Sequence, residues 1–357
     1  MAVYTTIDDP SAFFQTTLYT GNGSTTHAIT NGGNSDLQPD MVWIKDRGAA
    51  NWHSITDVVR GHSKALFPND TAAEDTSNAY VKAFNSDGFT LGSAGSDVNA
   101  NTNTYVSWQW KAGTSFTNDA SSTGIGSIDS AGSVNTDAGF SIMTYTGTGS
   151  NATFAHGLGA VPKMAIFKDR SSTGYWMTYH QAVGNGANLV LNETNALSAA
   201  SVWWNSTSPT SSVFSIGTSN NINVSGRNYV GYLFADVKGY SKFGVYTGNG
   251  NDNGPFVYTG FKPAWIMIKR VAGSTGSWLM VDSKRDPFNS GVSANELGAN
   301  VANAANDLSG DFKIDILSNG FKLRDDVGDC NASAQYVYLA FAENPFVTST
   351  GVPATAR

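Results

Sequence analysis

The chain has 357 residues, enough for two or three domains of about 100–200 residues each. Charged residues make up only 14% and aromatic residues 12%, including nine Trp, a balance that supports hydrophobic cores and argues against a disordered chain. The net charge is −7 without long runs of Lys or Arg, and no stretch reaches the roughly 20 apolar residues of a membrane span, so we expect neither a nucleic-acid nor a membrane partner.

Four landmarks recur three times along the chain in the same order. The first is Tyr-Thr-Gly-x-Gly, which starts at Tyr19, Tyr145 and Tyr246. The second is a Pro-led apolar run that ends in Lys, at residues 39–45, 162–168 and 263–269. The third is a Trp seven to nine residues further on, at Trp52, Trp176 and Trp278. The fourth is an aromatic strand-like segment, at residues 105–110, 229–234 and 336–341.

These repeats predict three tandem modules. Their opening prolines, Pro39, Pro162 and Pro263, lie 123 and 101 residues apart, whereas solenoid repeats are typically about 20–45 residues long. We therefore expect whole domains arranged like beads on a string. The predicted parts are an N-terminal arm (1–16), module 1 (17–113), a linker with module 2 (114–240), module 3 (241–342) and a C-terminal tail (343–357).

Short strands are predicted throughout each module. Apolar runs such as residues 41–45, bounded by turn residues, are typical of strands buried on both faces. Asp87-Gly88 and Asn319-Gly320 lie between apolar segments and predict hairpins. Segments 71–84 and 292–307 are predicted to be short helices or loops, and part of the linker at 111–136 to join module 2 as an edge strand. The predicted fold class is all-β, with a β-sandwich or jelly-roll-like module in each repeat.

The sequence offers no convincing catalytic or metal-binding pattern. Its five histidines (His27, His53, His62, His156 and His180) lack the spacing of a zinc site. The acidic groups 74–75 and 325–329 do not recur between modules, which favours solvated loop acids over a glycosidase pair. Turn formation explains segments 249–254 and 325–329 better than calcium binding does, because neither has EF-hand spacing. We predict a non-enzymatic protein with no metal and no cofactor.

Tryptophans supply the candidate binding residues. Recurrence of Trp52, Trp176 and Trp278 in all modules favours a shared core position over a sugar-stacking platform. Trp203 and Trp204 differ, because they occur in module 2 alone and in polar surroundings. Adjacent strand residues face opposite ways, so we predict that one of these two contacts a ligand or a partner.

The landmarks resemble those of a known family. Tyr-Thr-Gly-Asn-Gly at 19–23, Pro-Asp-Met-Val-Trp-Ile-Lys-Asp-Arg at 39–47, Phe-Asn-Ser-Asp-Gly-Phe-Thr-Leu at 84–91 and Trp-Gln-Trp-Lys-Ala-Gly at 108–113 are similar to a family of uncharacterised marine bacteriophage proteins. The opening segment 8–15 and the closing segment 341–357 are similar too. The resemblance covers essentially the whole chain and implies a virion structural protein.

This resemblance sets the expected function. The leading expectation is a tail-fibre or adhesin-type protein on the virion surface that contacts a host surface glycan, with avidity from several lectin-like modules. The alternative is a capsid decoration protein that binds capsomers, and a polysaccharide depolymerase ranks last. Residues 1–15 lack the pattern of a signal peptide, and the single Cys330 cannot form an intrachain disulfide, so we expect assembly in the host cytoplasm. Expected partners are other virion proteins and further copies of the chain, as a trimer by analogy with phage fibres.

Overall fold

The computed structural model describes all residues except 1–3, 77–79, 94, 290–293, 309–311 and 354–357. Within this part of the chain the fold is built almost wholly from antiparallel strands. The short helices are η1 (Pro10–Ala12) and α1 (Ala120–Thr123). The predicted all-β fold class is therefore confirmed.

Each of the three regions pairs a larger sheet with a smaller one. In module 1 the larger sheet has the order β1 (Phe14–Thr20), β7 (Thr104–Trp110), β3 (Met41–Asp46), β4 (Ser54–Asp57). The smaller sheet has the order β2 (His27–Ile29), β6 (Gly88–Leu91), β5 (Val81–Asn85). The two sheets enclose a core that includes Val42, Ile44, Phe89 and Leu91, as expected of a sandwich.

Modules 2 and 3 repeat this strand order. The larger sheet of module 2 has the order β15 (Ser198–Ala199), β14 (Ala187–Val190), β13 (Met177–His180), β12 (Met164–Asp169), β17 (Asn228–Phe234), β10 (Phe140–Thr146), β9 (Ser130–Asn135), β8 (Thr114–Asn118). Its smaller sheet consists of β11 (Ala152–Ala155) and β16 (Val213–Ile216). The larger sheet of module 3 runs β18 (Ser241–Thr247), β25 (Gln335–Pro345), β20 (Phe261–Arg270), β21 (Trp278–Asp282), β22 (Leu297–Gly298), and the smaller one runs β19 (Phe256–Tyr258), β24 (Gly320–Leu323), β23 (Ile314–Leu317).

Strand register defines which residues are equivalent. Asp57, His180 and Asp282 each lie opposite the third residue of the Pro-led run of their module, which is Met41, Met164 and Trp265 respectively. Counting back along each strand makes His53, and not Trp52, the counterpart of Trp176 and Trp278. The landmark alignment is thus wrong by one residue in module 1, and Trp52 is 41% exposed while Trp176 and Trp278 are fully buried.

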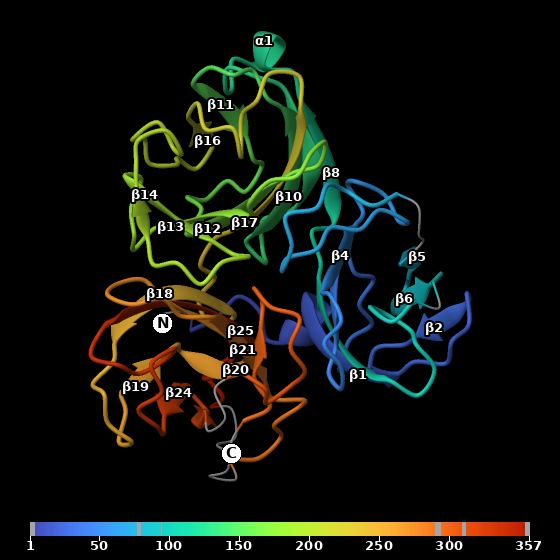
Figure 1. The fold of residues 1–357 in the computed structure, drawn as a ribbon, viewed down its shortest axis with the longest axis vertical. Coiled ribbons are helices and arrows are strands. Elements are labelled where there is room, and N and C mark those ends of the chain that lie inside the picture. The colour runs from blue at the N-terminus through green and yellow to red at the C-terminus, as the bar shows by residue number, and fades with distance from the viewer. Residues whose placement is uncertain (1–3, 77–79, 94, 290–293, 309–311, 354–357) are drawn as a thin grey trace.

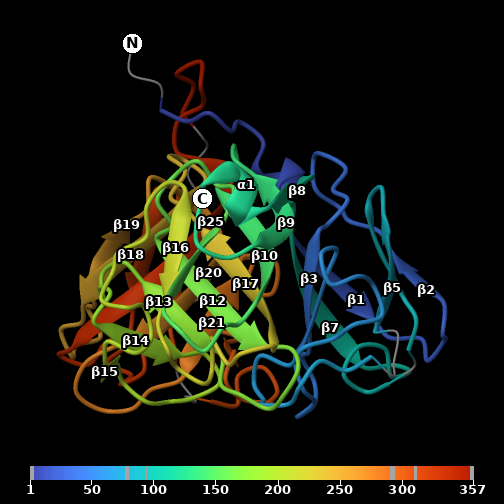
Figure 2. The ribbon, with the colours of Figure 1, turned by 90° about the horizontal axis from the view of Figure 1, so that it is seen from above.

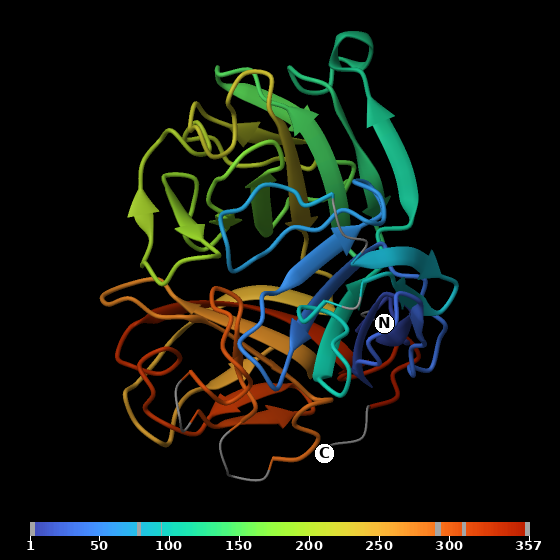
Figure 3. The same cartoon turned by 45° about the vertical axis from the view of Figure 1, so that its right-hand side comes forward.

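The three modules share one core, so the expectation of beads on a string is wrong. One buried cluster joins Trp43 and Trp110 of module 1, Trp176 of module 2, and Trp265 and Phe341 of module 3. The Pro-led strands are buried on both faces because one face packs inside its own module and the other packs at this centre. Figure 1 shows the three lobes around that centre, and in Figure 3 the blue strands of module 1 lie against both other lobes.

Both predicted hairpins are present. Asn85 pairs with Gly88 between β5 and β6, and Leu317 pairs with Gly320 between β23 and β24. Segment 71–84 is loop and strand where it is described, and the described part of 292–307 contains β22 but no helix. Part of the linker joins module 2, as predicted, because β8 and β9 extend its sheet beyond β10.

The chain ends meet on one face of the molecule. Phe14 to Thr16 belong to β1 and not to a free arm, and β25 continues to Pro345. The Ser349 N–H donates to Asp8 Oδ1 at 2.7 Å, which joins the N-terminal segment to the C-terminal one. Figure 2 shows the blue and red segments side by side.

Candidate functional site

Three equivalent junctions close the modules into a ring. Trp176 Nε1 of module 2 donates to the Phe67 carbonyl of module 1 at 2.9 Å, and Trp278 Nε1 of module 3 donates to the Val190 carbonyl of module 2 at 2.9 Å. His53 completes the ring, since its Nε2 lies 3.1 Å from the Val301 carbonyl of module 3. The last module is therefore bound to the first by the same kind of contact that joins sequence neighbours.

The His53 ring is held in one neutral form. Trp43 Nε1 donates to His53 Nδ1 at 2.9 Å, so Nδ1 is the acceptor and Nε2 carries the hydrogen for Val301. Burial, together with the nearby Lys45 charge, lowers the pKa of His53 well below its usual value. His53 thus acts as a fixed donor, in the way that an indole does in the other two modules.

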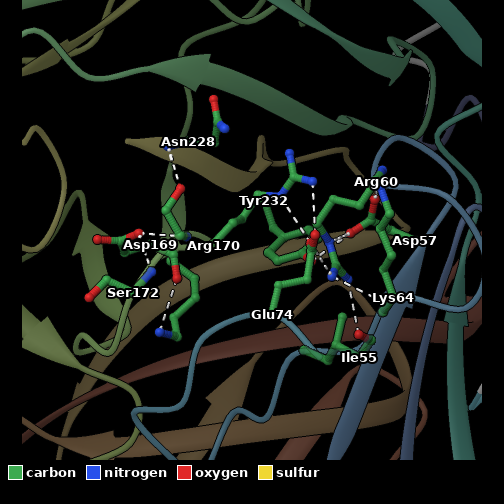
Figure 4. Close-up of polar contacts among 12 residues, drawn as sticks. Ile55, Asp57, Arg60, Lys64, Glu74, Asp169, Arg170, Ser172, Asn228 and Tyr232 are labelled. Atoms are coloured by element: carbon green, nitrogen blue, oxygen red, sulfur yellow. Dashed lines mark hydrogen bonds and ion pairs between the residues drawn. The ribbon is translucent and has the colours of Figure 1, made fainter. Parts of the chain in front are cut away.

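A buried ion network joins modules 1 and 2 (Figure 4). Arg60 Nε lies 2.6 Å from Asp57 Oδ2, and Arg60 Nη1 lies 3.1 Å from Glu74 Oε2. Arg170 of module 2 donates to both Glu74 oxygens at 2.9 and 3.0 Å. The Tyr232 hydroxyl of module 2 donates to Asp57 Oδ2 at 2.7 Å. Each carboxylate therefore accepts from both modules.

The charges in this network offset the penalty of burial. Burial favours the neutral form of Glu74, but the hydrogen bonds from Arg170 and the charge of Arg60 hold the pKa of Glu74 below its usual value. For Arg60, burial lowers the pKa of the guanidinium. The charges of Asp57, Tyr232 and Glu74 together outweigh burial and raise this pKa above its usual value. A carboxylate paired with two guanidiniums and closed off from solvent is suited to holding modules together, not to proton transfer.

The junction of modules 1 and 3 repeats part of this network. Arg285 Nε lies 2.6 Å from Asp282 Oδ2, and both side chains are fully buried. Trp108 Nε1 of module 1 donates to the same Asp282 oxygen at 3.1 Å, in the place that Tyr232 takes toward Asp57. These two junctions therefore share one arrangement, an Asp–Arg pair and an aromatic donor from the neighbouring module, with different side chains as the donor.

Among the residues that the structure describes, the junction of modules 2 and 3 has no such ion pair. His180 replaces the aspartate, and Leu339 of module 3 replaces the Trp or Tyr donor. The fully buried Nε2 of His180 makes no hydrogen bond with the described residues. Burial lowers the pKa of His180 to about 4, although the nearby Tyr338 backbone partly offsets this effect. His180 is therefore neutral at pH 7.

Two of the three repeated lysines bond across a module junction. Lys168 Nζ donates to the Thr71 carbonyl of module 1 at 3.0 Å, and Lys269 Nζ donates to the Thr194 carbonyl of module 2 at 2.8 Å. Lys45 Nζ instead bonds the Ala49 carbonyl of its own module at 3.0 Å. Burial lowers the pKa of each of the three to about 8. Since these side chains are fully buried, their role is to anchor loops.

An exposed groove is the best candidate for ligand contact. It has a volume of about 390 Å³ and lies between the N-terminal segment, the turn that joins modules 2 and 3, and the start of the C-terminal tail. Tyr4 and Tyr258 line it and are 52% and 60% exposed. Lys238 Nζ lies 5.5 Å from the centroid of the Tyr4 ring, and Lys242 Nζ lies 3.3 Å from Asp236 Oδ2. The groove thus combines aromatic faces with charged donors and an acceptor.

The structure places the predicted contact residues in the core of module 2. Trp204 is fully buried and donates to the Ala187 carbonyl at 2.8 Å, so a ligand-contacting role for it is wrong. Both residues lie in a turn and not in a strand, so they need not face opposite ways. Trp203 packs against the same core and is partly exposed. Its role as a contact remains a prediction.

The other sequence candidates have local partners. Asp325 accepts backbone N–H groups of Lys313 and Val327, and Asn249 Oδ1 accepts the Asn251 N–H. These are turn and loop contacts, as the sequence suggested. Among the described residues, no group of three or more His, Cys, Asp or Glu side chains could hold a metal ion.

Sequence reasoning missed the residues that build the junctions and the groove. Asp-x-x-Arg at residues 57–60 recurs at 282–285, each time starting at the last residue of equivalent strands, and this repeat was a usable signal. Nothing in the sequence brings Tyr4 next to residues 236–242 and 258–260, because only the folded chain joins those segments.

The fold and its junctions define an all-β, multi-sheet protein whose modules share a core. The chain belongs to the family described as Domain of unknown function (DUF7483), whose model matches residues 9–345. That match spans all three modules. No curated protein and no solved structure matches the chain. In the part of the chain that the structure describes, none of the helices is long and apolar enough to cross a membrane.

Proposed function

We propose that the protein is a non-enzymatic structural protein on the surface of a bacteriophage virion, of the tail-fibre or adhesin type, and that it contacts a host surface glycan. The groove lined by Tyr4 and Tyr258 carries this proposal. Exposed tyrosine rings can stack on the apolar face of a sugar, while Asp236 and Lys242 can bond its hydroxyls. The virion assignment is supported by the family resemblance of the landmark sequences.

Binding fits this groove better than hydrolysis does. Glycoside hydrolysis uses two carboxyl groups on either side of the scissile bond, roughly 5–10 Å apart. Among the residues that line the groove, Asp236 supplies the one carboxylate, and it is paired with Lys242. The network of Asp57 and Glu74 is buried at a module junction and offers no room for a sugar.

Binding of host surface polysaccharide to Tyr258→Ala tests the adhesin proposal. Loss of one stacking ring should weaken binding by about 2–10-fold, because aromatic stacking contributes about 0.5–1.5 kcal/mol. Tyr175→Ala is the matched control, since Tyr175 is an exposed tyrosine of module 2 outside the groove. Equal affinity of wild type and Tyr258→Ala in calorimetry would rule the groove out as the glycan site.

The closed ring of modules favours a second candidate, a capsid decoration protein. Three equivalent junctions place three similar modules around one centre, an arrangement that could match a three-fold site between capsomers. Gold-labelled antibody imaging of virions separates the candidates. Label at the tail supports adhesion, label over the head supports decoration, and absence from the particle contradicts both.

A further inference from the structure

The β8–β9 segment covers one open side of the module 2 sandwich. Strand β9 pairs with the outer edge of β10, with Ser133 opposite Ile142 and Ala131 opposite Thr144. The same segment reaches the smaller sheet, where Ile128 N–H donates to the Thr153 carbonyl at 3.1 Å. This side of module 2 is therefore closed by the chain itself.

The same side of module 3 is open. Val245 occupies the position of Thr144, one residue before the tyrosine of the repeated Tyr-Thr-Gly. Phe256 occupies the position of Thr153, one residue before an inward-facing core residue. Val245 is 44% exposed and Phe256 is 46% exposed. Module 3 thus shows large apolar side chains to solvent where module 2 has threonines beneath its own covering strand.

Beside this apolar surface, the edge of β18 has backbone groups that bond no other described residue. Ala342 N–H donates to the Tyr240 carbonyl and Gly248 N–H donates to the Ala334 carbonyl. The backbone N–H and C=O groups of the even-numbered residues of β18 therefore point toward β25. Val245 therefore directs both its N–H and its C=O outward, as alternation in an antiparallel ladder requires. The outward N–H of Phe243 is already bound by Asp236 Oδ1 at 2.8 Å, which limits the free edge to residues 243–247.

This edge lacks the usual protection against strand pairing. Natural edge strands avoid association through Lys, Pro, bulges or covering loops. Residues 243–247 include neither a charged residue nor a proline, and the pairing of β18 with β25 has no bulge. Lys242, just before them, is paired with Asp236 at 3.3 Å. A second identical strand would therefore meet no like charge across the contact.

We propose that β18 is a dimer contact, in which a second copy of this chain adds its own β18 antiparallel to the first. A two-fold axis at Val245 lets it exchange both hydrogen bonds with the partner's Val245. The Thr247 N–H then donates to the Phe243 carbonyl across the axis. The contact buries Val245 and brings the exposed Phe256 of each copy to the interface. This inference does not depend on the glycan or virion proposals.

Sedimentation of the full-length protein over a range of concentrations tests the dimer. Wild type should form a dimer, and Val245→Pro should weaken it on the order of 100-fold, because both central N–H donors disappear together. The same substitution should leave the fold intact, since this N–H points out of the sheet. Val245→Thr introduces the residue found at the equivalent position of module 2 and keeps the N–H, so this variant should still form a dimer.

Leu18→Pro is the matched control on module 1. Leu18 is the counterpart of Val245 and also directs its N–H outward. Ala28 stands where module 3 has the exposed Phe256, so the edge of β1 lacks the apolar surface that completes the proposed contact. The dimer of Leu18→Pro should match that of wild type. Should Val245→Pro fail to fold, Val245→Lys gives the same test, because it places like charges across the axis. A monomeric or trimeric wild type, or a variant with Pro or Lys at 245 that forms a dimer as tightly as wild type, would overturn the proposal.

Discussion

Arg60 shows at the scale of one residue how the modules are held together. Its guanidinium satisfies Asp57 and Glu74 together, and its side chain is fully buried. Arg60→Met would keep most of the volume but leave two buried carboxylates short of a partner. We expect a loss of about 3–5 kcal/mol in the free energy of unfolding, measured by denaturant titration.

An exposed ion pair provides the control for Arg60. Arg324 Nε lies 3.5 Å from Asp315 Oδ2, and the Arg324 side chain is 49% exposed. Arg324→Met should change the free energy of unfolding by less than about 1 kcal/mol, because solvent screens such a pair. If both variants lose the same amount, the buried network does not carry the stability that its geometry indicates.

His180 makes stability depend on pH. Burial lowers its pKa from the usual 6.5 to about 4 in the folded chain, so the unfolded state binds more protons between these values. Folding stability from this residue is complete above pH 6.5 and is lost as the pH falls toward 4. Between pH 7 and pH 4, His180→Leu should lose about 3 kcal/mol less stability than wild type. Identical pH profiles in denaturant titrations would contradict this assignment.

At the scale of elements, the size of the aromatic side chain that bonds across a junction is compensated by the size of its neighbour on the Pro-led strand. Module 1 combines a large Trp43 with the smaller His53, whereas module 2 combines Ile166 with Trp176. The two pairs occupy equivalent positions of the repeat, and Trp43, Ile166 and Trp176 belong to the shared core. The summed volume of the two side chains is therefore similar in both modules, but the larger side chain lies on the Pro-led strand in module 1 and beside the following strand in module 2.

This compensation predicts a coupled pair of substitutions. Trp176→His alone should cost about 2–3 kcal/mol through lost packing, and Ile166→Trp alone should cost about 1–3 kcal/mol through overpacking. Together they recreate the arrangement of module 1, in which the indole donates to the imidazole. A double-mutant cycle should show favourable coupling of about 1–3 kcal/mol. Additive losses would mean that the two modules pack in unrelated ways.

Local signals in the sequence were sufficient to predict many of the strands and turns of the fold. Short apolar runs between turn residues predicted the strands, and Asp-Gly and Asn-Gly predicted the hairpins at 85–88 and 317–320, because these depend on neighbouring residues. The error at Trp52 has a physical cause. Trp52 and His53 lie just before β4, and a shift of one residue there turns a side chain to another side of the chain, so Trp52 is exposed while His53 is buried.

The junctions and the groove could not be predicted in the same way. Trp108 bonds Asp282, and Tyr4 meets the turn at 236–242, across separations that no local pattern encodes. The burial of Trp204 could not be predicted from the sequence, because its neighbours in sequence are polar while its neighbours in space are Phe167, Tyr179 and Phe214. Composition near a residue is a poor guide to burial when distant strands supply the contacts.

At the scale of the whole molecule, the shared core makes the three modules depend on one another. Each module contributes a large aromatic residue to the centre, for example Trp43, Trp176 and Trp265, and would expose it to water if it stood alone. Burial of one such side chain contributes about 1.5–3 kcal/mol, so several together are comparable to the total stability of an ordinary domain.

The chain should therefore unfold in one cooperative transition. Calorimetry of the full-length protein should give a calorimetric enthalpy equal to the van't Hoff enthalpy, whereas independent modules would each add a transition and make the calorimetric value larger. Arg60→Met in module 1 should lower the midpoint of that single transition, and the aromatic near-ultraviolet signals of all modules should be lost together. If only part of the signal moved with the variant, module 1 would unfold separately and the ring of junctions would not couple the modules.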